Sequence, residues 1–330
     1  MRLDDLLAAL AHPQGASGSE LAARFGVTRA AVWKRIEALR AAGLAVEAVA
    51  GRGYRLAAPL DLLDAAAIRA ALPADAARRL ATLVVDAEVD STSSALLRDA
   101  AAGARSGSAR LAERQTAGRG RRGRAWQSPI AANLYLSVLW RFEGGLSALA
   151  GLSIAAGVAV AQALQTLGAD GVRLKWPNDL VHDDRKLGGI LVDAAGEWAG
   201  PCHAVVGIGI NVRMPAAAAA AIDQPWTDLA QVLGGRDGPL RNPVAAALLA
   251  QLLPALATFE TGGLAPFRTA FAALDALHGR AVTVHDGAAP WAATAAGLCD
   301  DGRLRVTDPK GREHRLAAAE VSVHRAAEAG

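Results

Sequence analysis

One segment of the sequence combines five arginines with three glycines, a pattern suited to binding an anion. It runs from Arg114 to Trp126 as Arg-Gln-Thr-Ala-Gly-Arg-Gly-Arg-Arg-Gly-Arg-Ala-Trp. Glycine permits a close approach of the backbone to a ligand, and guanidinium groups donate paired hydrogen bonds to carboxylate or phosphate oxygens. Strand-like sequence flanks the segment at residues 109–113 and 133–140. We therefore expect a functional loop that becomes ordered over an anion. A solvated basic loop or a nucleic-acid tail is the alternative.

A second group of charged residues lies on a predicted hairpin. Residues 172–179 have the pattern of a strand that ends in a turn fixed by a proline, and Lys186 opens the return strand. We expect the turn to bring Lys175, Asn178, Asp179 and Lys186 to one rim. Ammonium groups neutralise carboxylate or phosphate, and a carboxylate can hold Mg²⁺. The group indicates an anionic substrate used with a metal ion. An exposed, salt-bridged hairpin is the alternative.

Two further segments place small residues where a ligand could approach. Residues 90–93, Asp-Ser-Thr-Ser, lie between a predicted strand and a helix, where hydroxyl groups cap the helix or bind a neutral polar ligand. Gly207 and Gly209 interrupt a predicted strand, which usually marks a close approach by another group. The run from Ala216 to Ala221 is expected to be a mobile loop, closed by Trp226.

The first sixty residues have the pattern of a winged helix-turn-helix. A short helix at 19–25, a tight turn and a second helix from the Thr28 cap to about Ala42 precede two short strands joined near Arg52. Basic residues outnumber acidic ones on the second helix and the wing, so we expect salt-sensitive phosphate contacts with DNA. A small interaction domain that never touches DNA is the alternative. The expected DNA-binding residues are Thr28, Arg29, Lys34, Arg35, Arg40 and Arg52.

Length and composition predict a globular chain of two or three domains. The chain has 330 residues, 52% of them hydrophobic and 20% charged, and its net charge of +3 confines any nucleic-acid footprint to local patches. Cys202 and Cys299 match no metal or redox spacing and fit a reducing cytosol. The first residues do not resemble a signal peptide. Half of the uncharged stretch between Glu143 and Asp170 is Ala or Gly, which favours a buried core helix over a membrane helix.

The remaining segments predict helices followed by a small β domain. Residues 64–80 are expected to form one helix, and residues 242–279 two helices, the first bent at Pro254. From residue 280 the pattern changes to short alternating strands punctuated by Asp-Gly or Lys-Gly turns, typical of antiparallel sheet. The expected strands are 281–284, 292–298, 303–306 and 314–323, with turns at 286–287, 301–302 and 310–311.

The segments described above, and their order along the chain, resemble those of the biotin–protein ligases. The resemblance covers nearly the whole chain. With the winged helix in front, the sequence is similar to the bifunctional bacterial ligases that also repress the biotin operon. The family commonly has Asn where this chain has Ser93. The matching motifs are Ser91-Thr92-Ser93, Glu113 to Arg124, Lys175 to Asp179, Arg185 to Leu191 and Gly207 to Asn211.

The resemblance implies an α/β multidomain fold. A winged helix-turn-helix DNA-binding domain is expected at 1–60 and a class II synthetase-like, biotin/lipoate ligase-like α+β catalytic domain with a mixed sheet at 64–278. An SH3-like C-terminal β-barrel is expected at 279–330. The family further implies a cytoplasmic protein with no membrane contact, which forms a homodimer through its central sheet when the adenylate is bound.

The implied chemistry uses biotin, ATP and Mg²⁺. The biotin carboxylate attacks the α-phosphorus of ATP, and a lysine of a biotin carboxyl carrier protein, a subunit of acetyl-CoA carboxylase, then displaces AMP. The adenylate would also be the corepressor on operator DNA. A ligase whose winged helix does not repress, and a DNA-binding regulator with an inactive enzyme domain, are alternatives. A lipoate or octanoate enzyme is disfavoured, because a long aliphatic acid would leave Ser91, Thr92 and Gln115 unpaired.

The resemblance also implies roles for individual residues. Lys186, Arg121 and Asp179 are expected to be catalytic, with Asp179 holding the metal ion. The expected biotin contacts are Ser91, Thr92, Ser93, Gln115, Arg119, Gly120, Arg121 and Lys186. The expected nucleotide contacts are Gly118, Arg122, Arg124, Trp126, Lys175, Asn178, Asp179, Asn211 and Trp226.

Overall fold

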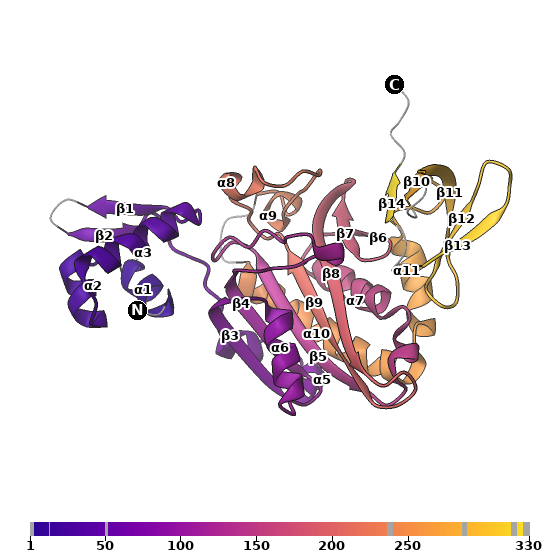
Figure 1. Ribbon diagram of the computed structural model, residues 1–330, viewed down its shortest axis with the longest axis horizontal. Helices are drawn as coiled ribbons and strands as arrows, with labels where there is room; N and C mark the ends of the chain where they lie inside the picture. Colours follow the sequence, from indigo (N-terminus) through magenta and orange to yellow (C-terminus); the bar gives the residue numbers. More distant parts are fainter. Residues whose placement is uncertain are drawn as a thin grey trace, which may run out of the picture.

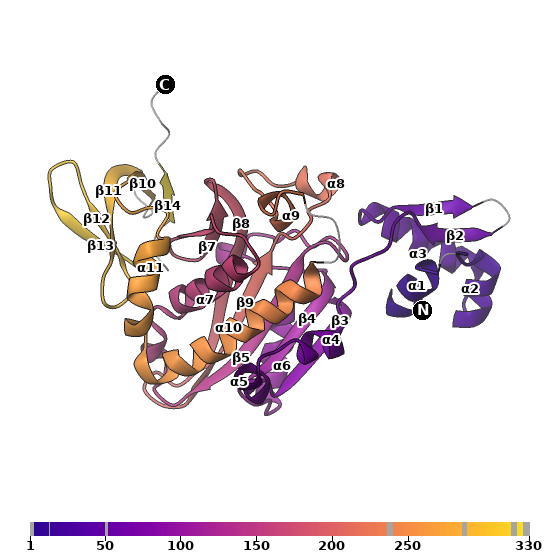
Figure 2. The ribbon, with the colours of Figure 1, turned by 180° about the vertical axis from the view of Figure 1, so that it is seen from behind.

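The computed structural model describes residues 3–12, 14–49, 52–235, 240–285, 289–317 and 322–325. An N-terminal helical unit, a central sheet with helices on both faces and a C-terminal group of strands follow one another along the chain (Figure 1). The N-terminal unit and the C-terminal strands lie at opposite ends of the central sheet, as the view from behind also shows (Figure 2).

The N-terminal unit is a helix-turn-helix with a two-stranded wing. Its elements are α1 (Leu3–Leu10), α2 (Gly18–Phe25), α3 (Arg29–Ala41), β1 (Val46–Val49) and β2 (Gly53–Leu56). The predicted cap is confirmed, because the Thr28 side chain accepts a hydrogen bond from the Ala31 N–H. Val32, Ile36 and Leu39 on α3 are buried. The sequence did not predict α1, which supplies buried leucines to the same core.

The single helix predicted at 64–80 is wrong. The structure has two short helices, α4 (Ala65–Ala70) and α5 (Ala74–Arg79), separated around Pro73. A proline ring disfavours helical backbone at the preceding residue and cannot donate to a helix, so the chain restarts there. The linker before α4 is held firmly: the Asp61 carboxylate accepts hydrogen bonds from the Leu240 and Arg241 N–H groups, where a long helix begins.

A seven-stranded mixed sheet forms the centre of the molecule. The order is β3-β4-β5-β9-β8-β7-β6, with β3 and β4 parallel and the other neighbours antiparallel. Helix α6 (Thr92–Ala101) covers one face, and α7 (Leu152–Thr166) and α10 (Arg241–Gly262) cover the other (Figures 1 and 2). The strands are β3 (Thr82–Val89), β4 (Ser108–Gln115), β5 (Leu134–Phe142), β6 (Arg173–Lys175), β7 (Asp179–His182), β8 (Arg185–Gly196) and β9 (Cys202–Ile210).

The uncharged stretch is a core helix, as predicted. Most of α7 is buried between the sheet and α10, which explains why no charge interrupts it. Within the described residues, α10 is the one helix whose length and composition would allow it to cross a membrane, and 56% of its most apolar window is buried inside the protein. Pro254 lies inside α10, as expected.

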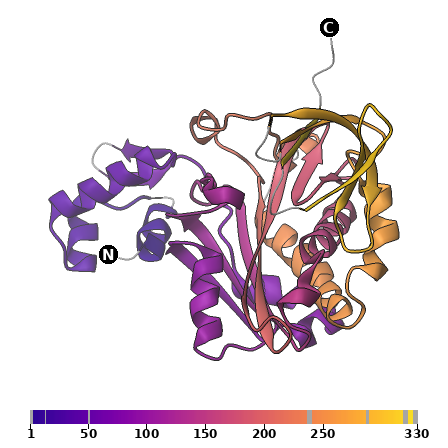
Figure 3. The same ribbon diagram turned by 45° about the vertical axis from the view of Figure 1, so that its right-hand side comes forward.

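The C-terminal strands form a separate antiparallel sheet beside α11 (Arg268–Leu274), on the far side of the central sheet from the N-terminal unit (Figure 3). Its order is β13-β12-β11-β10-β14. The single strand predicted at 314–323 is wrong, because the chain leaves β13 at Leu316 and returns as β14 against β10. The SH3-like barrel stays a prediction, and the turn predicted at 286–287 lies outside the described residues. The strands are β10 (Ala281–His285), β11 (Trp291–Leu298), β12 (Leu304–Thr307), β13 (Glu313–Leu316) and β14 (Ser322–Arg325).

Candidate active site

One cavity of about 890 Å³ collects all four segments that the sequence singled out. Residues 114–126 are called the Arg/Gly loop from here on. The cavity lies between this loop, the start of α6, the turn between β6 and β7, the glycine-bearing parts of β8 and β9, and residues 221–226. Gly118 does not line it and packs instead between Gln115, Ser128 and Trp126. The predicted residues that line the cavity are Ser91, Thr92, Ser93, Gln115, Arg119, Gly120, Arg121, Arg122, Arg124, Trp126, Lys175, Asn178, Asp179, Lys186, Asn211 and Trp226.

The Arg/Gly loop is folded as a short hairpin. The Trp126 N–H donates to the Gly118 carbonyl over 2.9 Å, and the Gly120 N–H donates to the Arg124 carbonyl over 2.8 Å. Positive φ at Arg122 and at the glycine after it turns the chain at the tip. The sequence did not predict these internal hydrogen bonds, which hold the arginines of the loop beside the cavity.

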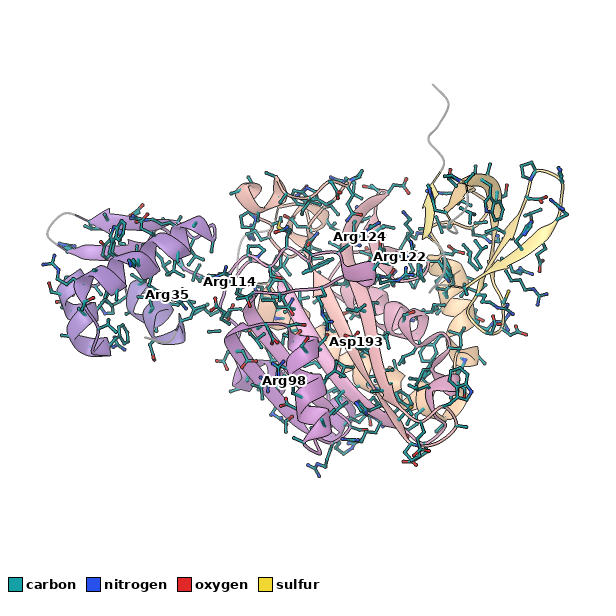
Figure 4. The ribbon with its side chains drawn as sticks, in the orientation of Figure 1. Arg35, Arg98, Arg114, Arg122, Arg124 and Asp193 are labelled. Carbon is teal, nitrogen blue, oxygen red and sulfur yellow. The ribbon has the colours of Figure 1, made fainter. Side chains whose placement is uncertain are left out.

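The arginines of the loop point in different directions. The Arg121 guanidinium donates to Asn178 Oδ1 over 3.3 Å, while Arg119 donates to Ser94 Oγ over 3.0 Å and lies 3.6 Å from Asp193 Oδ2. Burial lowers the pKa of Arg121, and the neighbouring arginine charges add to this lowering. A bound anion would oppose this lowering of the pKa, because a nearby negative charge stabilises the protonated guanidinium. Figure 4 shows Arg122 and Arg124 together at the upper edge of the central sheet, above Asp193.

Hydroxyl groups form a buried cluster at the start of α6. Ser91 caps the helix, and both the N–H and the Oγ1 of Thr92 lie within hydrogen-bond distance of Gln115 Oε1, at 2.9 and 3.2 Å. Ser137 joins the cluster from β5, with its Oγ 2.8 Å from Thr92 Oγ1 and 3.0 Å from Ser93 Oγ. This cluster offers both donors and acceptors to a neutral polar ligand.

The two glycines of β9 make room for other side chains, as predicted. A Cβ on Gly207 would lie 2.5 Å from Ser93 Oγ, and a Cβ on Gly209 would lie 2.6 Å from Trp126 Cε2. The indole of Trp126 therefore lies directly over the strand, with Lys186 Nζ 5.7 Å from its ring centre. Its Nε1 is buried over Gly209 and has no hydrogen-bond partner among the described residues.

The predicted rim of lysines, amide and carboxylate is confirmed. Lys186 Nζ lies 2.9 Å from Asp179 Oδ1, and both Lys175 and Asn178 line the same cavity. Burial lowers the pKa of Lys175, the positive charge of Lys186 lowers it further, and Asp179 opposes both. The expected turn after β7 is also present, since the two aspartates 183 and 184 have positive φ, as a two-residue hairpin requires.

The segment predicted as a mobile loop contains the one-turn helix α8 (Ala216–Ala219), so that prediction is wrong at this point. Beyond α8, the chain pairs with β8: the Lys186 N–H donates to the Pro225 carbonyl, and the Thr227 N–H donates to the Lys186 carbonyl, both over 2.9 Å. The Asn211 amide donates to the Thr227 carbonyl over 3.0 Å. Asn211 thus positions the wall that Trp226 completes.

A magnesium ion fits this site only in combination with a ligand that brings further oxygens. Among the residues that the structure describes, no group of three or more His, Cys, Asp or Glu side chains is placed to hold a metal ion. Asp179 and Asp184 both line the cavity. Mg²⁺ is commonly held by one or two carboxylates together with substrate phosphates. The donor set therefore suits an ion that arrives on a polyphosphate.

Two of the predicted DNA-binding arginines already have partners within the protein. Arg35 lies 3.7 Å from Glu88 on β3, and Arg114 of β4 lies 3.0 Å from the same carboxylate. Figure 4 shows Arg35 and Arg114 on facing sides of the boundary between the N-terminal unit and the central sheet. Arg40 pairs with Glu37 at 2.7 Å. In contrast, Arg29, Lys34 and Arg52 are exposed, and Thr28 caps α3.

Sequence reasoning missed Ser137, Asp184 and Asp193. A signal for Ser137 existed, because polar residues occupy every second position of residues 133–137 in an otherwise apolar strand. Such alternation places the polar groups on one face of the sheet. The two aspartates gave no comparable signal. Asp184 reaches the cavity through the turn between β7 and β8, and Asp193 lies on β8 near Arg119.

Comparison with known proteins agrees with this geometry. A helix-turn-helix model matches residues 2–55, and the biotin/lipoate A/B protein ligase family model matches residues 87–211. The bifunctional ligase/repressor BirA of Escherichia coli is 44% identical over 270 residues, which cover 82% of this chain and 81% of that protein. The biotin–[acetyl-CoA-carboxylase] ligase of Paracoccus denitrificans is 36% identical over 217 residues, covering 64% of this chain and 88% of the relative.

A solved structure has the same fold. The biotin protein ligase from Aquifex aeolicus in complex with biotin and ATP is 27% identical, with a TM-score of 0.62, and the match covers 74% of this chain and all of that chain. The chain therefore belongs to the biotin/lipoate ligase family and, within it, to the bifunctional ligase/repressor proteins.

Proposed function

We propose that this chain activates biotin with ATP and transfers it to a lysine of a biotin carboxyl carrier protein. It also acts in the cytoplasm as a repressor that binds operator DNA when the biotinyl adenylate is present. The observation that supports this most is the single cavity in which guanidinium, ammonium, carboxylate and hydroxyl groups meet. Family membership identifies the acid as biotin more specifically than the geometry does.

The hydroxyl cluster is the proposed site of the biotin ring system. A ureido ring presents two N–H donors and a carbonyl acceptor, which suit the hydroxyl groups of Ser91, Thr92 and Ser93 and the Gln115 amide. Ser137 lies behind them and orients two of the hydroxyls. A purely aliphatic acid would offer no hydrogen-bonding groups to this polar cluster, which favours biotin over lipoate or octanoate.

The first step joins two anions. The biotin carboxylate oxygen attacks the α-phosphorus of ATP, the bond from that phosphorus to the bridging oxygen of the β-phosphate breaks, and pyrophosphate leaves with the electron pair. Lys186 and Arg121 lower the repulsion between the two anions, so catalysis rests on positioning and charge neutralisation. For this, Lys186 exchanges Asp179 for a substrate oxygen. Lys175 and Asn178 are the proposed nucleotide contacts, and Asp179 is the proposed Mg²⁺ ligand.

The second step forms an amide. The neutral ε-amine of the acceptor lysine attacks the acyl carbon, AMP leaves with the electron pair, and the amine gives up a proton. Asp179 is the proposed acceptor of that proton. A free mixed anhydride hydrolyses, so the site must also exclude water. The Arg/Gly loop, with Trp126, and the wall completed by Trp226 are the elements proposed to enclose the adenylate.

The repressor function requires the adenylate to be both intermediate and corepressor. We propose that it promotes a homodimer through the central sheet and so presents two winged helices to operator DNA. The proposed domains are residues 1–60, 64–278 and 279–330, with an SH3-like barrel as the last. A gel-shift assay on DNA from upstream of biotin synthesis genes, with and without biotin and ATP, tests the claim. If the chain does not bind this DNA in an adenylate-dependent way at low salt, it is a ligase that does not act as a repressor.

Biotin-dependent ATP–pyrophosphate exchange tests the ligase function. Lys186→Ala or Arg121→Gly should reduce exchange by about tenfold or more, because each removes a charge that neutralises the reacting anions. Lys310→Ala, at an exposed lysine of the C-terminal sheet, is the matched control and should exchange like the wild type. Wild-type exchange in both site variants would contradict the assigned roles, and mass spectrometry of the acceptor lysine identifies the acid transferred.

A further inference from the structure

Trp33 is a large apolar side chain exposed on the second helix of the helix-turn-helix. It is 53% exposed, and it belongs to α3, the helix that such motifs place in the DNA major groove. The other large hydrophobic side chains that are exposed among the described residues are Val84 and Trp198, both outside the N-terminal unit. Neither the fold nor the proposed catalysis uses Trp33.

The direction of Trp33 follows from the helix it belongs to. Successive residues of an α-helix are rotated by about 100°, so Trp33 and Arg35 lie roughly 200° apart around α3. Arg35 faces the central sheet, because it pairs with Glu88 on β3. Val32 and Ile36 face the core of the N-terminal unit. Trp33 therefore faces away from the catalytic part of the molecule and is open to a large partner.

Positive charge surrounds the indole. Arg29 lies one turn earlier on the same flank of α3, and Lys34 follows Trp33 directly, and both are exposed. Glu37, one turn later, is paired with Arg40 at 2.7 Å and so adds little free negative charge. An aromatic ring between exposed cations fits the major groove of DNA, where phosphates flank base edges that include apolar methyl groups.

We propose that Trp33 determines part of the operator sequence by packing its ring against thymine methyl groups in the major groove. Trp33 lies in the N-terminal half of α3, where helix-turn-helix proteins contact base edges. Arg29, Lys34 and Arg52 hold phosphates on either side and set the overall affinity. This inference rests on the proposed repressor function and adds a residue that reads sequence.

The test uses the full chain with biotin and ATP and a duplex selected by the wild-type protein from a random-sequence pool. Dissociation constants are measured for this duplex and for a scrambled one over a range of salt concentrations. Trp33→Ala should reduce the ratio of specific to non-specific affinity by about tenfold and leave the salt dependence unchanged. Lys34→Ala, the matched control, should weaken both duplexes together and lower the salt slope by about one.

Uracil in place of thymine removes only the methyl group of the base. The substituted duplex should bind wild-type protein more weakly and should make no further difference to Trp33→Ala. Two results would overturn the inference: an unchanged specificity ratio in Trp33→Ala, or a loss of binding that accompanies loss of self-association in sedimentation, which would place Trp33 against a second copy. Failure of the wild type to bind any duplex in an adenylate-dependent way would refute the repressor function itself.

Discussion

Replacing Gly209 by alanine should impair catalysis while leaving the fold intact. The new Cβ would lie 2.6 Å from Trp126 Cε2, 2.7 Å from Cζ2 and 3.0 Å from Nε1. Carbon atoms pack best at about 3.5–4.0 Å, so the indole must move by about 1 Å. Gly209 lies in β9 and pairs with β5 on one side and β8 on the other, in an ordinary strand conformation that alanine also adopts.

The magnitude follows from the place of Trp126. The ring lies beside Lys186 and forms a wall of the cavity, so its displacement changes the geometry at the reacting atoms. A displacement of about 1 Å can reduce the rate by about 10²-fold, which corresponds to about 3 kcal/mol of activation free energy. The overpacking cost to stability, about 1–3 kcal/mol, is offset in part by the removal of a flexible glycine from a strand.

The assay is biotin-dependent ATP–pyrophosphate exchange, with thermal unfolding measured on the same samples. Trp126→Phe removes the atoms that the new methyl group meets, so the alanine substitution should cost less in that background. Trp126→Phe alone is the matched control. Two results would refute the inference that the absence of a side chain at Gly209 makes room for Trp126. One is wild-type exchange by Gly209→Ala, and the other is an equal loss of exchange activity in the wild-type and Trp126→Phe backgrounds.

Three further perturbations follow from the structure. Glu113→Gln removes the buried charge that pairs with Arg241, while Arg241 keeps its hydrogen bonds to the Asn133 and Asp61 carbonyls. It should reduce the unfolding free energy by about 3–5 kcal/mol in urea titrations, and a loss under about 1 kcal/mol would argue against it. Burial lowers the pKa of Lys175, so ATP affinity should fall as pH rises through that lowered value. Lys175→Arg should shift the fall upward, and identical titration profiles would contradict this. Glu88→Gln frees Arg35, which lies on the side of α3 opposite Trp33, so DNA affinity at low salt should change by less than about twofold and stability by at most about 1 kcal/mol. A severalfold rise in affinity in anisotropy titrations would place Arg35 against DNA and contradict the orientation of α3.

The sequence predicted those parts of the fold that depend on neighbouring residues. Thr28 caps its helix because a hydroxyl three residues before an N–H reaches it in any helix start. Gly207 and Gly209 marked close approaches, and the structure confirms both. The break in the helix around Pro73 also follows from a local rule, because proline disfavours helical backbone at the residue before it. Local steric rules act over a few residues, so no knowledge of the tertiary fold is needed to apply them.

The site is predictable as a set of segments and not as a set of contacts. Four separate motifs indicated an anion site, yet which residues touch within it depends on strand pairing. Ser137 reaches the hydroxyl cluster only because β5 lies beneath α6, and Asp193 meets Arg119 only because β8 passes the Arg/Gly loop. No local pattern of residues connects the members of these pairs.

The sequence alone predicted the helix-turn-helix, the basic loop and the lysine–aspartate rim, because each is defined by residue types at short spacing. Only the tertiary structure decided that Arg35 is tied to Glu88, that Asp61 holds the start of α10 and that Trp126 occupies the space left by Gly209. These contacts join residues 53 to 180 positions apart, and packing of the whole chain, not local preference, brings them within reach.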